Sequence, residues 1–179
     1  MRMSVVLASS LLALGLLAAA LPPAQDGAKA EARAKELLAP FAGNWDTEFT
    51  MPGVPPMKGS EVVKAMSHGL SLIITSSGDM GPMGPYEGHG VLGYDRKAGK
   101  WMHVWTDNAD PGMSVSEGRW SDDGKSFIVE FEQDMGMGPV KAVSTMHLDD
   151  ADHMTWTMRA KDDPADAAPM MSAKYTRKR

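Results

Sequence analysis

From residue 44 onward, hydrophobic and polar positions alternate with a period of two, which is the pattern of β-strands with one buried face. In the first such segment Trp45 and Phe49 fall on one face, and Asp46 and Glu48 fall on the other. Other segments are short β-branched or aliphatic runs, which also indicate strands. We expect strands at residues 44–51, 62–66, 70–75, 90–94, 101–106, 113–120, 127–132, 140–148, 154–158 and 170–177.

The segments between these strands contain turn residues. Asp95 to Gly99 and Ser121 to Gly124 are typical of the tight turns that join antiparallel neighbours. No helical pattern lies between any two strands, so the crossover connections of a parallel sheet are missing. About ten antiparallel strands either stack as two sheets or close into a barrel, and their regular up-and-down spacing favours the barrel. We therefore predict an all-β fold, an antiparallel up-and-down β-barrel.

One short helix is expected before the first strand. Ala28 to Leu38 is rich in alanine, and Glu31 and Lys35 are four residues apart, a spacing that supports a helix. Pro40 then ends the helical pattern.

The first twenty residues follow the plan of a secretory signal peptide. Arg2 gives a positive start, Val5 to Leu17 is mostly apolar, and Ala18 to Ala20 supplies small residues before a cleavage site. An uncleaved membrane anchor is the alternative, but the apolar run of about 16 residues is shorter than the ~20 needed to span a bilayer. The expected domains are residues 1–20 as signal peptide, 21–36 as lead-in and short helix, and 37–179 as one barrel domain.

The amino-acid composition limits the expected cellular location and the expected binding partners. The chain has no cysteine, which excludes disulfides, thiolate metal sites and lipid attachment through an N-terminal cysteine. Its net charge is −5, and its 18 Lys and Arg residues form no basic face, so nucleic acid is not an expected partner. We expect a soluble protein in the periplasm or outside the cell that is not a lipoprotein and has no membrane span once the signal peptide is cleaved.

Several short motifs occur along the chain in the same order as in a known family of barrels. Gly43-Asn44-Trp45 opens the first strand in the way that G-x-W opens lipocalin-like (calycin) barrels. Pro85-Tyr86-Glu87-Gly88-His89-Gly90 running to Gly93-Tyr94-Asp95, Trp105-Thr106-Asp107 and Ser116-Glu117-Gly118 follow in order. Together, over residues 37–178, they resemble a bacterial family of exported calycin-like barrels labelled domain of unknown function 1579.

This resemblance implies a fold and no activity. It implies that Trp45 closes the floor of the barrel and that a basic side chain from the last strand, Arg177, lies over it. Nitrobindin-like relatives of this barrel class bind haem through a histidine near the end of the chain. Here the last histidine is His153, so haem is not expected, and we expect no other cofactor.

The interior of such a barrel is a candidate ligand site, because a closed barrel of soft and aromatic side chains suits a small, largely apolar molecule. His103 shares one face with two tryptophans and is a candidate polar anchor, although a histidine that only hydrogen-bonds a neighbour fits the pattern as well. The candidate ligand-binding residues are Trp45, Phe49, Trp101, His103, Trp105, Met154, Trp156 and Met158.

A metal-binding or catalytic site is a second hypothesis, and it depends on one hairpin register. If Gly93 pairs with Trp101, then Glu87, His89, His103 and Asp107 gather on one face. A shift by one residue places Gly90 opposite Trp105, a sterically attractive register, and the cluster dissolves.

The sixteen methionines raise a copper hypothesis, because soft thioethers bind Cu(I). Met80 and Met83 in one loop, and Met135 and Met137 in another, are two or three residues apart. Methionine as an adaptable filler is the favoured interpretation, since the residues are spread over almost every strand. A third hypothesis makes the barrel a structural or protein-interaction module whose 79–84 loop contacts a partner. No catalytic motif is present, and the oligomeric state is not predicted.

Overall fold

The computed structural model describes residues 24–81, 84–109, 112–134, 139–164 and 166–179. The predicted signal peptide, residues 1–20, lies outside the described residues. None of the helices in the described part is long and apolar enough to cross a membrane. The elements are α1 (Ala24–Leu38), a 3-10 turn η1 (Ala39–Phe41), β1 (Gly43–Thr50), β2 (Met57–Ala65), β3 (Ser71–Asp79), β4 (Pro85–Asp95), β5 (Lys100–Asp107), β6 (Ser114–Trp120), β7 (Ser126–Asp134), β8 (Pro139–Leu148), β9 (His153–Ala160) and β10 (Met171–Arg177).

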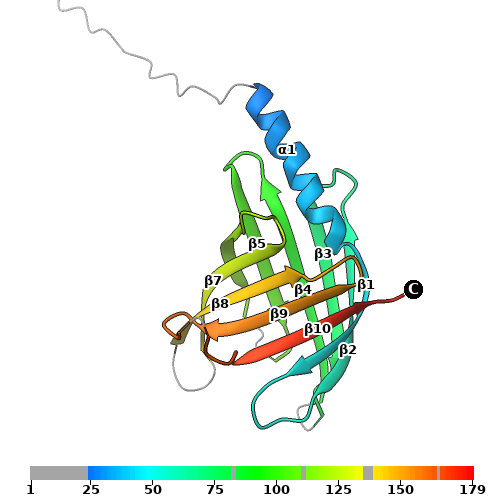
Figure 1. The fold of residues 1–179 in the computed structure, drawn as a ribbon, viewed down its shortest axis with the longest axis vertical. Helices are drawn as coiled ribbons and strands as arrows, with labels where there is room; N and C mark the ends of the chain where they lie inside the picture. Colours follow the sequence, from blue (N-terminus) through cyan, green and yellow to red (C-terminus); the bar gives the residue numbers. More distant parts are fainter. Residues whose placement is uncertain (1–23, 82–83, 110–111, 135–138, 165) are drawn as a thin grey trace, which may run out of the picture.

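The ten strands close into one antiparallel barrel, which confirms the predicted fold (Figure 1). Each strand pairs with its neighbours in the chain, and β1 pairs with both β2 and β10 to complete the ring. Closure leaves no unpaired sheet edge, so strands with weak β-propensity are still held on both sides. This explains why β2 and β4 begin earlier than the pattern predicted, in the glycine-containing segments after Met57 and Pro85.

Helix α1 lies at one end of the barrel, which we call the closed end (Figure 1). The helix buries Ala34, Leu37 and Leu38, and the Leu38 side chain is only 1% exposed. The Arg96 guanidinium, in the turn between β4 and β5, donates to the Glu31 carboxylate of α1 at 3.0 Å. The opposite end, where β1 runs into β2 and β3 into β4, is called the open end.

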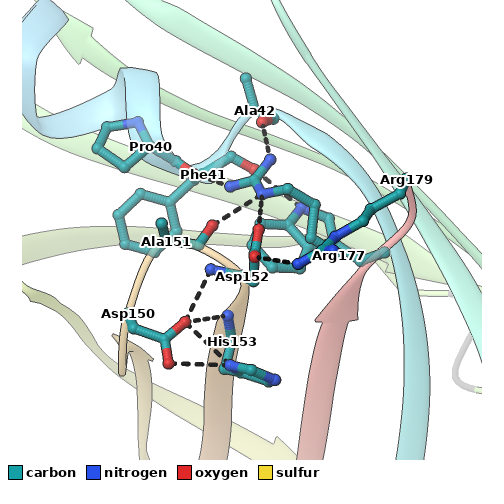
Figure 2. A network of polar contacts seen from close by, with 10 residues as sticks. Pro40, Phe41, Ala42, Asp150, Ala151, Asp152, His153, Arg177 and Arg179 are labelled. Atoms are coloured by element: carbon teal, nitrogen blue, oxygen red, sulfur yellow. Dashed lines mark hydrogen bonds and ion pairs between the residues drawn. The ribbon is translucent and has the colours of Figure 1, made fainter.

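The Arg177 side chain connects several segments at the closed end of the barrel, which forms its floor (Figure 2). Its guanidinium lies over the Trp45 ring, 4.1 Å from the centroid, as the family resemblance implied. It donates to the backbone carbonyls of Pro40 and Ala42, at 2.7 Å each, and of Ala151 at 2.8 Å. One side chain of β10 thereby joins the segment before β1 to the turn between β8 and β9.

The G-x-W glycine has a steric cause at this floor. A Cβ on Gly43 would lie 2.2 Å from Nη1 of Arg177, a distance that real Cβ atoms do not reach. Gly43 also has a φ of 154°, which L side chains rarely adopt. The motif therefore makes room for the guanidinium that covers Trp45.

Aromatic rings fill the closed half above this floor. The Trp120 ring packs against Phe41 at 5.5 Å, Trp101 at 5.4 Å and Phe127 at 5.2 Å between centroids. Tilted and edge-on arrangements of this kind are favourable for aromatic pairs. The closed half is thus a packed hydrophobic core.

Candidate ligand site inside the barrel

The predicted ligand-binding residues all lie on inward faces, but they divide between the two halves of the barrel. Trp45 is 0% exposed and Met154 is 1% exposed, so both belong to the packed closed half together with Trp101. The other five, Phe49, His103, Trp105, Trp156 and Met158, lie further along their strands from the floor. Of these, only Met158 is fully buried.

Aromatic faces in this second group are partly accessible to solvent although they point into the barrel. Phe49 and Trp156 stack with centroids 6.1 Å apart. The His103 and Trp105 rings are 6.2 Å apart and nearly parallel, at 12°. Because these side chains are half-buried rather than buried, solvent reaches the inside of the open half.

The pairing of β4 with β5 shows whether the four residues of the metal or catalytic hypothesis share one face. Gly90 lies opposite Trp105, so the register with Gly93 opposite Trp101 is wrong and the shifted register is confirmed. Since side chains alternate between faces, Glu87 and His89 point outward, while His103 and Asp107 point inward. The predicted four-residue cluster does not form.

The side chains of the two outward residues of that cluster hydrogen-bond to each other. His89 Nε2 and Glu87 Oε1 are 2.9 Å apart, and both side chains are exposed. Among the described residues, no group of three or more His, Asp or Glu side chains is arranged to hold a metal ion. Of the four methionines in the copper hypothesis, Met83, Met135 and Met137 lie outside the described residues. Met80 lines a depression of about 320 Å³ on the rim of the open end, beside Met57.

Two glycines of β4 seat the Trp105 indole against the inner wall. A Cβ on Gly88 would lie 2.6 Å from the Trp105 ring, and a Cβ on Gly90 would lie 2.5 Å from it. The ring therefore lies flat over bare backbone. This position brings the indole nitrogen to the end of β5.

The Asp107 carboxylate, at the end of β5, accepts hydrogen bonds from several neighbouring groups. Its Oδ2 accepts a hydrogen bond from Trp105 Nε1 at 2.9 Å and from the Tyr86 hydroxyl at 3.2 Å. Its Oδ1 accepts from the backbone N–H of Ala109 at 3.0 Å. Burial, followed by the charge of Asp107, raises the pKa of Tyr86, so this phenol stays a neutral donor.

Glu61 is the interior residue that the sequence pattern did not single out. It lies in β2 between Trp45 of β1 and Ser76 of β3 and is only 4% exposed. Burial raises the pKa of its carboxyl to about 7, and a hydrogen bond from Ser76 opposes part of that rise. Its Oε1 is buried and has no hydrogen-bond partner in the protein.

The alternation of residues along β2 contains a sequence signal for Glu61. Met57, Gly59, Glu61 and Val63 are alternate residues of one strand and share its inward face. A carboxylate in that row conflicts with an apolar interior, and such a conflict is characteristic of functional positions.

Two further inward-facing titratable groups, His103 and Tyr175, are neutral at physiological pH. Burial lowers the pKa of His103 to about 4, which leaves a neutral imidazole facing Leu92 and Ser116. Burial, with the nearby Glu61 charge second, raises the pKa of Tyr175 well above its usual value. Besides Glu61 and Asp107, the described interior polar groups thus include the phenols of Tyr86 and Tyr175 and the neutral imidazole of His103.

Comparisons with known proteins support the fold and supply no activity. A family model described as "Protein of unknown function (DUF1579)" matches residues 31–177. No curated protein matches significantly. The crystal structure of Rv2717c from M. tuberculosis is similar, with 18% sequence identity and a TM-score of 0.52, over 82% of this chain and 98% of that chain. A redesigned β-barrel, mFAP0, bound to DFHBI, is 14% identical with a TM-score of 0.44, over 77% of this chain and 99% of that one.

Proposed function

This chain belongs to the DUF1579 family, and we propose that it is a binding protein for a small, largely apolar molecule held in the open half of its barrel. The observation that carries the proposal is the difference between the two halves. Trp45, Leu38 and Phe41 are at most 2% exposed in the closed half, whereas inward-facing Phe49 and Trp156 keep accessible surface. Partly accessible aromatic faces in a concave surface are the usual lining of small-molecule sites.

The lining of the open half is predominantly apolar on the strands from β7 to β10. Phe131 faces inward opposite Ala142, and Met158 lies opposite both Ser144 and Met171. Methionine side chains adapt their shape to a ligand, which suits a binding surface for apolar molecules.

A pair of neighbouring substitutions on β8 tests this proposal. Ser144→Phe adds a ring on the inward face, between Val129 and Met158, while Thr145→Phe adds the same ring to the outward face. We expect Ser144→Phe to abolish binding of an apolar fluorescent probe and Thr145→Phe to leave it unchanged. The readout is tryptophan emission during titration with the probe, after both variants have been shown to unfold cooperatively.

Equal binding by both variants, or no binding by the unmodified protein to probes of any length, would refute an interior site. Native mass spectrometry of the protein taken from its own cells adds a direct measurement. An organic adduct of fixed stoichiometry is the expected result.

We also propose that the barrel works outside the cytoplasm, on the basis of the signal-peptide pattern in residues 1–20. The expected N-terminus of the mature protein is Leu21. Mass determination of the protein recovered from its native compartment tests this, and a mass that includes Met1 to Ala20 would contradict it.

A further inference from the structure

We infer that the barrel interior selects an organic cation, a molecule with a protonated amine on an apolar body, and that Glu61 is its anionic anchor. This inference rests on the proposed binding function and names the class of ligand. It is built from an unsatisfied carboxylate oxygen, the charges on the inner wall and the rings beside them.

Glu61 has hydrogen-bonding capacity that the protein does not use. Its Oε1 is buried without a partner, and Ser76 is the side chain that bonds to the carboxyl. A buried carboxylate oxygen without a donor costs free energy, so such oxygens are normally satisfied by a protein group, a water or a ligand. A ligand ammonium offers three donors and a compensating charge.

Two aromatic donors of the inner wall near Glu61 are committed to Asp107. The Tyr86 hydroxyl and the Trp105 indole N–H both donate to Asp107. The inner wall formed by β2 to β5 therefore has two carboxyls, and the donors of Tyr86 and Trp105 serve only Asp107.

Within the described part of the chain, no cation is placed to neutralise Glu61. Among the inward-facing residues of the described strands, Arg177 is the only one with an ammonium or guanidinium group. Its guanidinium is held at the floor by three backbone carbonyls and the Trp45 ring. His103, the inward histidine, is half-buried, and its lowered pKa keeps it neutral. An anionic head group would meet two carboxyls and no cation here.

Aromatic faces beside this wall strengthen the preference for a cation. Trp105 lies flat on the inner face of β4, with part of its surface accessible. Trp156 and Phe49 face inward from β9 and β1. A cation over a tryptophan face gains electrostatic stabilisation, most strongly where water is excluded. The mostly apolar inward faces of β7 to β10, across the barrel from β3 to β5, are suited to the ligand body.

Three ligands of equal chain length separate this inference from the binding function itself. We would titrate the full mature chain at pH 8 with octylamine, octanoate and 1-octanol, using tryptophan emission and calorimetry. Octylamine should bind roughly tenfold or more tightly than octanoate, because a charge-assisted hydrogen bond contributes about 1.5–3 kcal/mol. In Glu61→Gln, octylamine affinity should fall by a similar factor while 1-octanol affinity is unchanged. The matched control, Glu48→Gln, alters an exposed carboxyl on the outward face of β1 and should change neither.

Each other outcome is informative. Octanoate binding as tightly as octylamine would overturn the cation preference and leave the binding function standing. An equal loss of octylamine and 1-octanol affinity in Glu61→Gln would show that Glu61 is merely structural. Binding of none of the three ligands would refute the proposed function, and this inference with it.

Discussion

At the residue scale, the buried carboxyl of Glu61 makes the stability of the fold depend on pH. Its pKa rises from 4.5 to about 7 on folding, chiefly through burial. Between those values the unfolded chain releases a proton that the folded chain retains, so stability falls as pH rises from about 4.5 to 7 and then levels off. The groups facing Glu61 include Tyr86 and Tyr175, whose raised pKa values keep them neutral throughout this range.

Glu61→Gln removes this titration and should therefore stabilise the protein in a pH-dependent way. At pH 8 the variant should be more stable by up to about 3 kcal/mol, from 1.36 kcal/mol per pKa unit. At pH 4.5 the two proteins should differ little. Urea unfolding at both pH values measures the difference, with Glu48→Gln as the exposed control. A stability difference that is the same at both pH values would contradict this account.

Sequence patterns could identify the residues whose polarity agrees with the face of the strand on which they lie. Trp45 and Phe49 are aromatic on an inward face, and the period of two was enough to assign them. Glu61 escaped because the predicted strand began only at residue 62, so no face was assigned to Glu61. The pairing of β2 with β1 and β3 extends the strand to Met57, and the alternation along the extended strand then places Glu61 inside.

At the element scale, the strands were predictable and their register was not. The alternation in each segment gave ten strands, and closure extended β2 and β4 beyond that pattern. The β4–β5 register followed instead from a long-range steric fit, the flat seat of Trp105 on Gly88 and Gly90. The sequence left two registers open because the loop between the strands does not fix the pairing, although the observed register was already the sterically attractive one.

A similar fit between strands predicts the effect of one added methyl group. A Cβ on Gly118 of β6 would lie 2.1 Å from the Phe127 ring, which Trp101 and Trp120 hold in place. Gly118→Ala should therefore destabilise the barrel by about 1–3 kcal/mol, as overpacking does. Gly27→Ala in α1, where nothing lies within 4 Å, should instead stabilise by up to about 1 kcal/mol. Denaturant unfolding compares them, and the same sign for both would count against the packing argument.

Arg177 joins three elements, and its replacement tests how far they depend on it. Arg177→Lys keeps the charge but cannot reproduce three carbonyl contacts from one planar group. We expect a loss of about 2 kcal/mol or more in the free energy of unfolding. Arg179→Lys, at a side chain that is 89% exposed, should stay within about 0.5 kcal/mol. Equal effects of the two substitutions would mean that the floor is held by Trp45 packing alone.

At the scale of the whole molecule, the barrel combines a packed end with a partly accessible one, and Glu61 lies beside Trp45 where the two meet. Ligand binding and proton binding are then linked, because a cation next to Glu61 favours its ionised form. Saturating octylamine should reduce the loss of stability between pH 4.5 and 7 that the empty barrel undergoes. Octylamine should also bind more tightly at pH 8 than at pH 5, since the carboxyl is ionised only at the higher value.

Thermal unfolding across this pH range, with and without octylamine, measures the linkage. The increase in Tm caused by octylamine should grow with pH in the unmodified protein and be constant in Glu61→Gln, which has no proton to release. 1-Octanol, which lacks a charge, should raise Tm by the same amount at every pH in both proteins. An octylamine effect that grows with pH in Glu61→Gln as well would place the titrating group elsewhere in the barrel, and Asp107 would be the next carboxyl to replace.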